Sequence, residues 1–304
     1  MRVAFERAPE TRFADLPELP YEPRYLEWQG LRLARIDEGA GSPIVLLHGE
    51  PTWSFLWRRV MGPLLEAGHR CIAPDMPGFG RSDKPTDLDW YSYDRHSEAM
   101  LFVLDELDVR DATLVMHDWG GPVGLRAAVE RPERIGRIVV LDTGVFTGRQ
   151  RMAEAWHRFR DFVEQTEDLP ISALVAGGTK RALSPEVLAA YDAPFPTPAS
   201  KAGARAFPLM IPLSPDDPGA EAGRRVTEAL RADPRPKLAL WAAEDPVIPL
   251  ESGRRVAAAL GIDELEVIED AAHFLQEDQG PVVGERIVGW LAEREPPRSA
   301  PRTG

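Results

Sequence analysis

The hydrophobic positions of this chain fall into two recurring patterns, short continuous apolar runs and longer segments with apolar residues at helical spacing. The short runs have the length and composition of buried strands. They occupy Ile44–Leu47, Arg70–Ala73, Thr113–Met116, Ile138–Leu141, Lys237–Ala242 and Glu264–Ile268. Two further segments, Arg24–Gln29 and Leu31–Asp37, predict a hairpin around Gly30. Helices are predicted between the strands, at Phe55–Leu65, Tyr93–Leu107, Ser252–Leu260 and Pro281–Glu293.

This alternation of strands and helices predicts an α/β protein with a mostly parallel sheet and right-handed crossovers. It stops between about Gly148 and Leu213, where the pattern is helical and irregular. We therefore expect a core domain formed by residues 1–147 and 214–304 and a helical cap domain at 148–213, inserted after the sixth strand. The cap is expected over the carboxyl edge of the sheet, where ligands bind in open α/β sheets.

Composition and charge exclude several classes of protein. The 304 residues carry a formal net charge of −13 and no run of basic residues, which argues against binding to nucleic acid. No apolar stretch is long enough to span a membrane, and the N-terminus lacks the apolar core of a signal peptide. Cys71 is the single cysteine, so no internal disulfide can form. These features predict a cytoplasmic protein.

Asp118 lies where a strand, a sharp turn and a helix meet. The run Thr113–Met116 is followed by the turn and by Gly120-Gly121, which let the next helix pack closely. This pattern predicts a nucleophile elbow, which exposes one side chain above the sheet. Met116 stands where such elbows usually have glycine. Esterases carry serine at the exposed position, whereas a carboxylate there favours attack on carbon and an ester that water later cleaves. The alternative is that Asp118 only caps the helix.

An ester on a buried aspartate persists unless a base activates water. His273 follows the last strand, at the sheet edge where Asp118 lies, and the pKa of histidine suits a general base. The order nucleophile, acid, histidine along the chain singles out His273 and places the acid at Asp245, after the preceding strand. Asp142, which follows strand six, is a rival for the role of the acid.

Water attack on the ester creates an oxyanion, which two N–H donors must stabilise. The backbone of Trp119, directly after Asp118, supplies one of them. The backbone of Glu50, in the turn after Ile44–Leu47, is placed to supply the other. The side chain of Glu50 need not take part in the chemistry.

Six motifs along the chain carry a resemblance to a known family. They are HGEPTW at His48–Trp53, DMPGFGRSDKP at Asp75–Pro85, HDWGG at His117–Gly121, YDAPFP at Tyr191–Pro196, KAGARAFP at Lys201–Pro208 and HFLQED at His273–Asp278. Through them the chain resembles the haloalkane dehalogenases, from roughly residue 10 to 293. The resemblance implies the α/β-hydrolase fold, with a mostly parallel eight-stranded sheet, helices on both faces and a cap inserted after strand six.

The resemblance also implies roles for individual residues. Asp118 is expected to be the nucleophile, His273 the base and Asp245 the acid, with Glu50 and Trp119 forming the oxyanion hole. Members of the family cleave carbon–halogen bonds with water and release alcohol, halide and a proton, without a cofactor or metal. The expected partners are a haloalkane substrate and its halide product, with no nucleic acid and no membrane. We expect a monomer or a weak homodimer.

The halide needs donors without negative charge, and an indole N–H is a donor that cannot accept. Trp119 is expected to supply one such donor. In the family members most like this sequence, a cap tryptophan supplies the second, but its position here falls on Phe159. Trp156 lies one helical turn earlier and can share a helix face with Phe159. Either Trp156 binds halide in its place, as we expect, or the second donor is missing.

Three other functions are compatible with parts of the pattern. An epoxide hydrolase uses the same Asp-His-Asp triad but needs acidic donors from the cap, usually two tyrosines, and the segment 148–213 contains only Tyr191. A metal-dependent hydrolase would need paired ligand spacings that are missing here. A non-catalytic binding protein would be expected to have lost a member of the triad.

Overall fold

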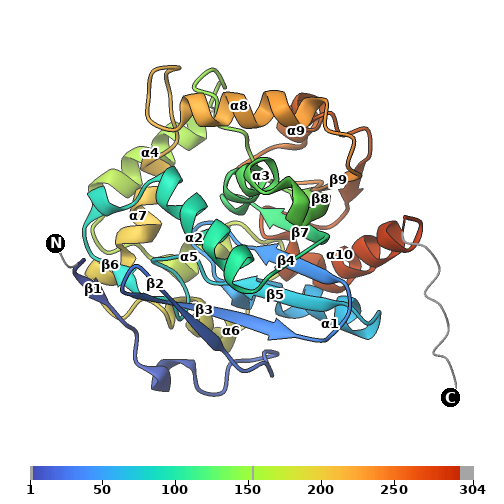
Figure 1. Ribbon diagram of the computed structural model, residues 1–304. Helices are drawn as coiled ribbons and strands as arrows, with labels where there is room; N and C mark the ends of the chain where they lie inside the picture. The colour runs from blue at the N-terminus through green and yellow to red at the C-terminus, as the bar shows by residue number, and fades with distance from the viewer. Residues whose placement is uncertain (1–2, 153, 295–304) are drawn as a thin grey trace, which may run out of the picture.

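The computed structural model describes residues 3–152 and 154–294, and its centre is an eight-stranded sheet (Figure 1). The strand order is β2-β3-β5-β4-β7-β8-β9-β10. The strands are β2 (Arg24–Trp28), β3 (Leu31–Glu38), β4 (Pro43–Leu47), β5 (Arg70–Pro74), β7 (Ala112–His117), β8 (Ile135–Leu141), β9 (Lys237–Ala242) and β10 (Leu265–Ile268). β3 pairs antiparallel with β2 and β5, and all other neighbours are parallel. The predicted mostly parallel, eight-stranded sheet is confirmed.

Both faces of the sheet are buried, because side chains alternate between two helical layers. In β4, Ile44 and Leu46 belong to one core cluster, while Val45 and Leu47 belong to the other. The first cluster includes α1 (Arg58–Glu66) and α10 (Leu275–Ala292). The second includes α2 (Tyr93–Glu106), α3 (Gly120–Glu130), α8 (Ala220–Arg231) and α9 (Leu250–Leu260). The central strands therefore consist of near-continuous apolar residues.

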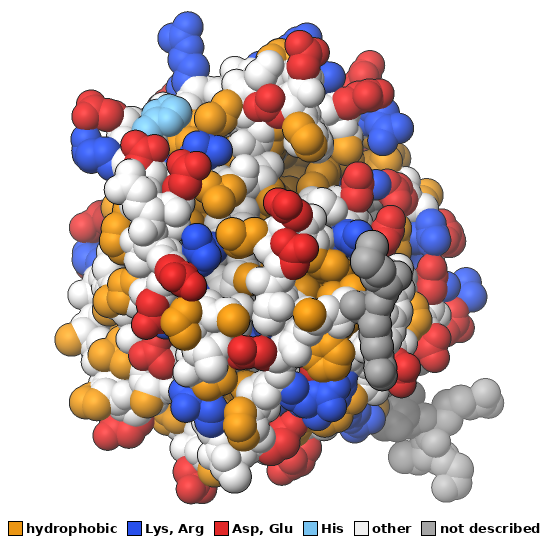
Figure 2. All heavy atoms as spheres, turned by 90° about the vertical axis from the view of Figure 1, so that its left-hand side faces the viewer, with side chains coloured by type: hydrophobic (Ala, Val, Ile, Leu, Met, Phe, Trp, Pro, Cys, Tyr) orange, Lys and Arg blue, Asp and Glu red, His pale blue; other side chains and the backbone are white. Residues whose placement is uncertain are grey.

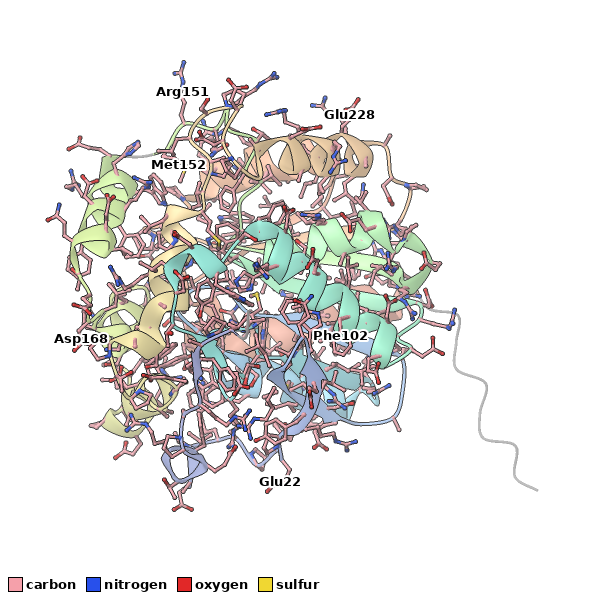
Figure 3. All side chains as sticks on the ribbon, turned by 60° about the vertical axis from the view of Figure 1, so that its left-hand side comes forward. Glu22, Phe102, Arg151, Met152, Asp168 and Glu228 are labelled. Carbon is pink, nitrogen blue, oxygen red and sulfur yellow. The ribbon has the colours of Figure 1, made fainter. Side chains whose placement is uncertain are left out.

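A series of helices follows β8, the sixth strand of the sheet. It comprises α4 (Glu154–Gln165), α5 (Ile171–Gly177), α6 (Pro185–Asp192) and α7 (Ala202–Leu209), followed by α8, for which the sequence pattern predicted no element. In Figure 3, Arg151 and Met152 lie near the start of this series and Asp168 at its outer side. Figure 2 shows the face of the molecule that lies on the left in Figure 1, where acidic, basic and apolar side chains are interspersed. This face therefore offers no basic footprint for nucleic acid.

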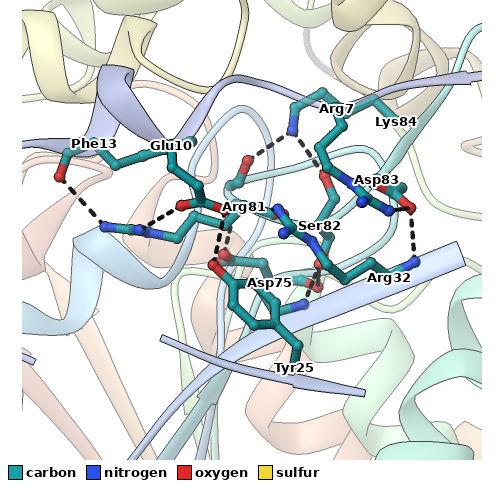
Figure 4. Close-up of polar contacts among 12 residues, drawn as sticks. Arg7, Glu10, Phe13, Tyr25, Arg32, Asp75, Arg81, Ser82, Asp83 and Lys84 are labelled. Atoms are coloured by element: carbon teal, nitrogen blue, oxygen red, sulfur yellow. Dashed lines mark hydrogen bonds and ion pairs between the residues drawn. The ribbon is translucent and has the colours of Figure 1, made fainter. Parts of the chain in front are cut away.

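The N-terminal segment wraps the surface and is fixed to the loop that follows β5 (Figure 4). β1 (Phe5–Glu6) pairs antiparallel with β6 (Lys84–Pro85). The guanidinium group of Arg7 donates two hydrogen bonds of 2.6 and 2.7 Å to the buried carboxylate of Asp83. Lys84 is fully buried and donates to two backbone carbonyls of the same loop. The loop that follows β5 is therefore held in place at both the N-terminal segment and its own backbone.

The last helix begins earlier than predicted. α10 begins at Leu275 rather than at Pro281 and is kinked at Gln279, where φ is −133°. Pro281 has no N–H and disfavours helical geometry in the preceding residues, which explains both the kink and the predicted boundary. The remaining short turns are the 3₁₀ helices η1 (Glu10–Phe13), η2 (Ser54–Trp57), η3 (Leu88–Trp90), η4 (Pro132–Arg134) and η5 (Ala199–Lys201). Within residues 3–152 and 154–294, no helix is both long and apolar enough to cross a membrane.

Candidate active site

Asp118 occupies a sharp turn between β7 and α3, with a φ of +48°. This left-handed conformation is strained for a residue other than glycine, and such strain is typical of functional sites. Thr143 Oγ donates a 2.5 Å hydrogen bond to the backbone carbonyl of Asp118. A Cβ on Gly49 would lie 2.2 Å from Oδ1 of Asp118, and one on Gly121 would lie 1.9 Å from Oγ1 of Thr143. Glycine at these two positions therefore lets the turn pack closely.

Met116 fits the elbow because a glycine elsewhere makes room for it. A Cβ on Gly124, one turn into α3, would lie 2.3 Å from the sulfur of Met116. The close contact between strand and helix is thus kept although the usual glycine two positions before Asp118 is absent.

The two carboxylate oxygens of Asp118 have different surroundings. Oδ1 accepts a 2.8 Å hydrogen bond from the backbone N–H of Glu50, and the backbone N–H of Trp119 also bonds the carboxylate. Oδ2 lies 3.9 Å from Nε2 of His273. Burial raises the pKa of Asp118, while the charge of His273 and the two backbone donors oppose this rise. Oδ1 is therefore held by a fixed backbone donor, and Oδ2 lies on the side of His273.

His273 is oriented by Asp245. Nδ1 of His273 donates a 2.9 Å hydrogen bond to Oδ2 of Asp245, whose Oδ1 accepts from the backbone N–H groups of Val247 and Ile248 at 2.6 and 2.9 Å. Burial disfavours protonation of His273, but the charges of Asp245 and Asp118 and the hydrogen bond to Asp245 outweigh it and raise the pKa of His273. With the proton on Nδ1, Nε2 carries the lone pair on the side of Asp118.

Asp142 lies close to Asp245. It directly follows β8, has a φ of +34°, is fully buried and accepts a 3.0 Å hydrogen bond from the backbone N–H of Ala242. Burial, the charge of Asp245 and a hydrogen bond to that residue raise the pKa of Asp142 well above its usual range. Asp142 therefore holds a proton and donates to Asp245, and of the two acids Asp245 is the one bonded to the imidazole.

His117 is a site residue that sequence reasoning missed. It is fully buried, and its Nε2 donates a 2.8 Å hydrogen bond to the backbone carbonyl of His273. Burial, followed by the charge of His273, lowers the pKa of His117 well below its usual value, which keeps the ring neutral. His117 therefore anchors the backbone of His273 rather than serving as a second base. Its position next to Asp118 was the only available signal.

A cavity of about 310 Å³ opens onto Asp118 and His273. Its apolar wall includes Leu174, Pro208, Ile211, Val247 and Phe274, and both Trp156 and Phe159 of α4 line it. Trp119 also lines it. Among the described residues, neither the indole N–H of Trp119 nor that of Trp156 has an acceptor. The cavity suits a small apolar molecule whose leaving group accepts hydrogen bonds.

Tyr191, the tyrosine that an epoxide hydrolase would need in its cap, lies outside this cavity. The hydroxyl of Tyr191 is fully buried and donates to Glu277, whose carboxylate also pairs with Arg58 at 2.5 and 2.8 Å. In the part of the chain that the structure describes, no group of three or more His, Cys, Asp or Glu residues is arranged to hold a metal ion.

Comparisons with known proteins point to one family. The sequence model of the family described as alpha/beta hydrolase fold matches residues 42–279. A haloalkane dehalogenase of Mycolicibacterium paratuberculosis is 42% identical over 294 residues, which cover 93% of this chain and 97% of that protein. A haloalkane dehalogenase of Mycobacterium marinum is 43% identical over 296 residues, which cover 93% and 98%.

A comparison with solved structures points to the same family. Haloalkane dehalogenase DpaA from Paraglaciecola agarilytica NO2, described as tetrameric, is similar with a TM-score of 0.87 and 34% identity, covering 93% of this chain and 97% of that one. The similarity extends over nearly the whole length of both chains. This chain therefore belongs to the haloalkane dehalogenase family, within the alpha/beta hydrolases.

Proposed function

We propose that this protein hydrolyses haloalkanes to alcohol and halide through a covalent alkyl ester on Asp118. The observation that carries the proposal is the unequal environment of the carboxylate of Asp118, with Oδ1 bonded to the backbone N–H of Glu50 and Oδ2 beside His273 in a largely apolar cavity. The relatives named haloalkane dehalogenase support this substrate class. The reaction requires water and no cofactor.

In the first step Oδ2 of Asp118 attacks the carbon that bears the halogen. The carbon–oxygen bond forms as the carbon–halogen bond breaks, and the halogen leaves with the bonding electrons as halide. The indole N–H of Trp119, together with that of Trp156, donates to the departing halide. Neutral donors in a dry cavity act mainly in the transition state, where the charge on the halogen develops.

In the second step Nε2 of His273 takes a proton from water, and the hydroxide attacks Cγ of Asp118. The charge develops on Oδ1, which already accepts from the N–H group of Glu50, and the N–H group of Trp119 also bonds this carboxylate. Asp245 stabilises the imidazolium. Collapse breaks the bond between Cγ and Oδ2, His273 returns a proton to the alcohol, and Asp118 regains its carboxylate with one oxygen from water. The balance is one haloalkane and one water to one alcohol, one halide and one proton.

We infer that residues 148–213 act as a cap over the core formed by 1–147 and 214–304. The contribution of α4 and α5 to the cavity wall supports this division. We also propose that the protein acts in the cytoplasm as a monomer or weak homodimer, which size-exclusion chromatography with light scattering would test.

A substrate panel tests the proposed function directly. Chloro-, bromo- and iodoalkanes should release halide and acidify a weakly buffered dye solution, whereas styrene oxide should give no diol. His273→Ala should accumulate an adduct with 1-bromobutane that intact mass spectrometry detects and that maps to the peptide containing Asp118. Diol formation without halide release would favour the epoxide-hydrolase alternative, and many turnovers without any adduct in His273→Ala would exclude the covalent route.

A further inference from the structure

The carboxyl group of Glu50 has no function in the mechanism above. The backbone N–H of Glu50 bonds Asp118, but its side chain also lines the cavity. This side chain is enclosed, since the residue is only 9% exposed. Its Oε1 is sealed from solvent and has no hydrogen-bond partner among the described residues. A buried carboxyl group without donors is costly in its charged form, so its protonation state requires an explanation.

The surroundings of the two carboxyl groups differ in a way that decides which one is charged. Asp118 has the imidazole of His273 and two backbone N–H donors. Glu50 has none of these, and burial followed by the charge of Asp118 raises the pKa of Glu50 well above its usual value. The proton therefore resides on Glu50, which leaves Asp118 ionised and nucleophilic. Because Oε1 is sealed and receives no donor, it acts as the carbonyl oxygen, and Oε2 carries the hydroxyl.

We propose that Glu50 is a neutral carboxylic acid whose O–H donates a hydrogen bond to the leaving halide, alongside the indole of Trp119. This proposal rests on the proposed function, because it assigns a donor to the halide that dehalogenation releases. The proton stays on Glu50 throughout, since hydrogen halides are far stronger acids than a carboxylic acid. An ionised Glu50 would repel the halide, so the same group favours halide only while protonated.

This assignment also bears on the number of halide donors. Phe159, at the expected cap position, cannot donate, and Trp156 reaches the cavity from α4. Glu50 lies on the core side, next to Asp118 and fixed by its own backbone hydrogen bond. A hydrogen bond to a charged group contributes enough to change an affinity by roughly tenfold or more.

Bromide binding tests the proposal without any substrate. Quenching of tryptophan fluorescence by bromide would be titrated from pH 5 to pH 10 in the wild type, in Glu50→Gln, which keeps a neutral donor, and in Glu50→Met, which keeps the length without a donor. Asp118, His273 and Glu50 are the titratable residues that line the cavity, with Asp245 behind His273. The series would therefore be repeated in the His273→Phe background.

In the His273→Phe variant, which retains Glu50, bromide affinity should fall at least tenfold as pH rises through the pKa of Glu50. Glu50→Gln should remove this fall and retain most of the low-pH affinity, whereas Glu50→Met should bind weakly at every pH. Equal bromide affinity in Glu50→Met and in the chain with Glu50 below pH 7 would overturn the proposal, as would an unchanged alkaline fall in Glu50→Gln.

Infrared difference spectra give a second readout that requires neither halide nor turnover. The wild type minus Glu50→Gln spectrum at pH 7 should contain the carbonyl band of a neutral carboxylic acid. Asp142→Asn removes the separate band of Asp142 and serves as the control. A missing band for Glu50 would refute the proposal even if haloalkanes are hydrolysed. If haloalkanes are not hydrolysed while this band and the bromide results hold, the proposed function fails and the protonated Glu50 stands.

Discussion

Oδ2 of Asp118 and Nε2 of His273 lie 3.9 Å apart, beyond hydrogen-bonding distance, while Nδ1 of the same ring bonds Asp245 at 2.9 Å. A serine nucleophile must give its proton to the histidine, and the two are therefore bonded. A carboxylate has no proton to give. The separation leaves the lone pair of Nε2 available for water, so in the mechanism proposed above His273 acts in the second half of the reaction and not in the first.

The rate of ester hydrolysis should rise with pH through the pKa of His273, because only the neutral ring can accept a proton from water. In the alkyl-enzyme Asp118 is a neutral ester, so of the charges that raise this pKa in the free enzyme only that of Asp245, with its hydrogen bond, remains. The rise should therefore be centred at a lower pH than the titration of His273 in the free enzyme. Rapid-quench measurement of alkyl-enzyme decay from pH 5 to pH 10 checks it. Decay that slows as pH rises from 6 to 9 would contradict the assignment of His273 as the base.

Asp245→Asn should reduce turnover by roughly 10⁴-fold, because the ring loses both its orientation and the charge that stabilises the imidazolium. Asp142→Asn is the matched control, since an amide at position 142 can still donate to Asp245, and it should reduce turnover by less than about tenfold. Steady-state kinetics with 1-bromobutane compares the two variants. If Asp142→Asn causes the larger loss, the acid has been assigned to the wrong residue.

Trp156→Phe should weaken bromide affinity and bromoalkane turnover by about tenfold, because the halide loses one N–H donor. Phe159→Trp, on the same wall, should strengthen both. Trp28→Phe is the control, since Trp28 packs against Trp90 and does not line the cavity. Halide release and fluorescence quenching are the two readouts. If Trp156→Phe keeps the bromide affinity and turnover of the wild type, Trp156 is not a halide donor, and Trp119 and Glu50 remain in that role.

Asp278 joins the segment after α5 to the loop that carries His273. Its carboxylate accepts from the backbone N–H groups of Lys180, Arg181 and Ala272 at 2.9–3.0 Å. Close by, the N–H of Phe274 donates to the carbonyl of Gly178 at 3.0 Å. Asp278 therefore positions His273 relative to the cavity wall.

Asp278→Ala should lower kcat about tenfold, with the loss in ester hydrolysis rather than in alkylation, because His273 and not Asp118 is displaced. Asp278→Asn, which keeps one acceptor oxygen, should be intermediate. Asp270→Ala is the control, since the carboxylate of Asp270 is exposed and pairs with Lys180 at 3.3 Å. Stopped-flow measurement of the two half-reactions separates the steps. Equal losses in Asp278→Ala and Asp270→Ala would count against this role.

The fold was predictable because buried strands leave a local signal. Apolar runs marked the six mutually parallel strands to within three residues at each end, and the order of Asp118, Asp245 and His273 followed from the strands that precede them. α8 was missed although its buried residues, Ala220, Gly223, Val226 and Leu230, recur at helical spacing, because only the last two are strongly apolar.

Tertiary contacts could not be predicted in the same way. The hydrogen bonds of Asp278 with Lys180 and Arg181 join residues nearly 100 positions apart, and no local pattern encodes them. The protonated states of Glu50 and Asp142 result from burial beside another carboxylate, which depends on packing. Spacing along α4 also gave no choice between Trp156 and Phe159, because both residues line the cavity.

A single turnover in ¹⁸O-water, with enzyme in excess over 1-bromobutane, tests the covalent mechanism most directly. The first butanol formed should carry no ¹⁸O, because its oxygen comes from Oδ2 of Asp118, and the label should appear in the peptide containing Asp118. Butanol labelled from the first turnover, with an unlabelled Asp118, would contradict the covalent mechanism and make Asp118 a base that activates water.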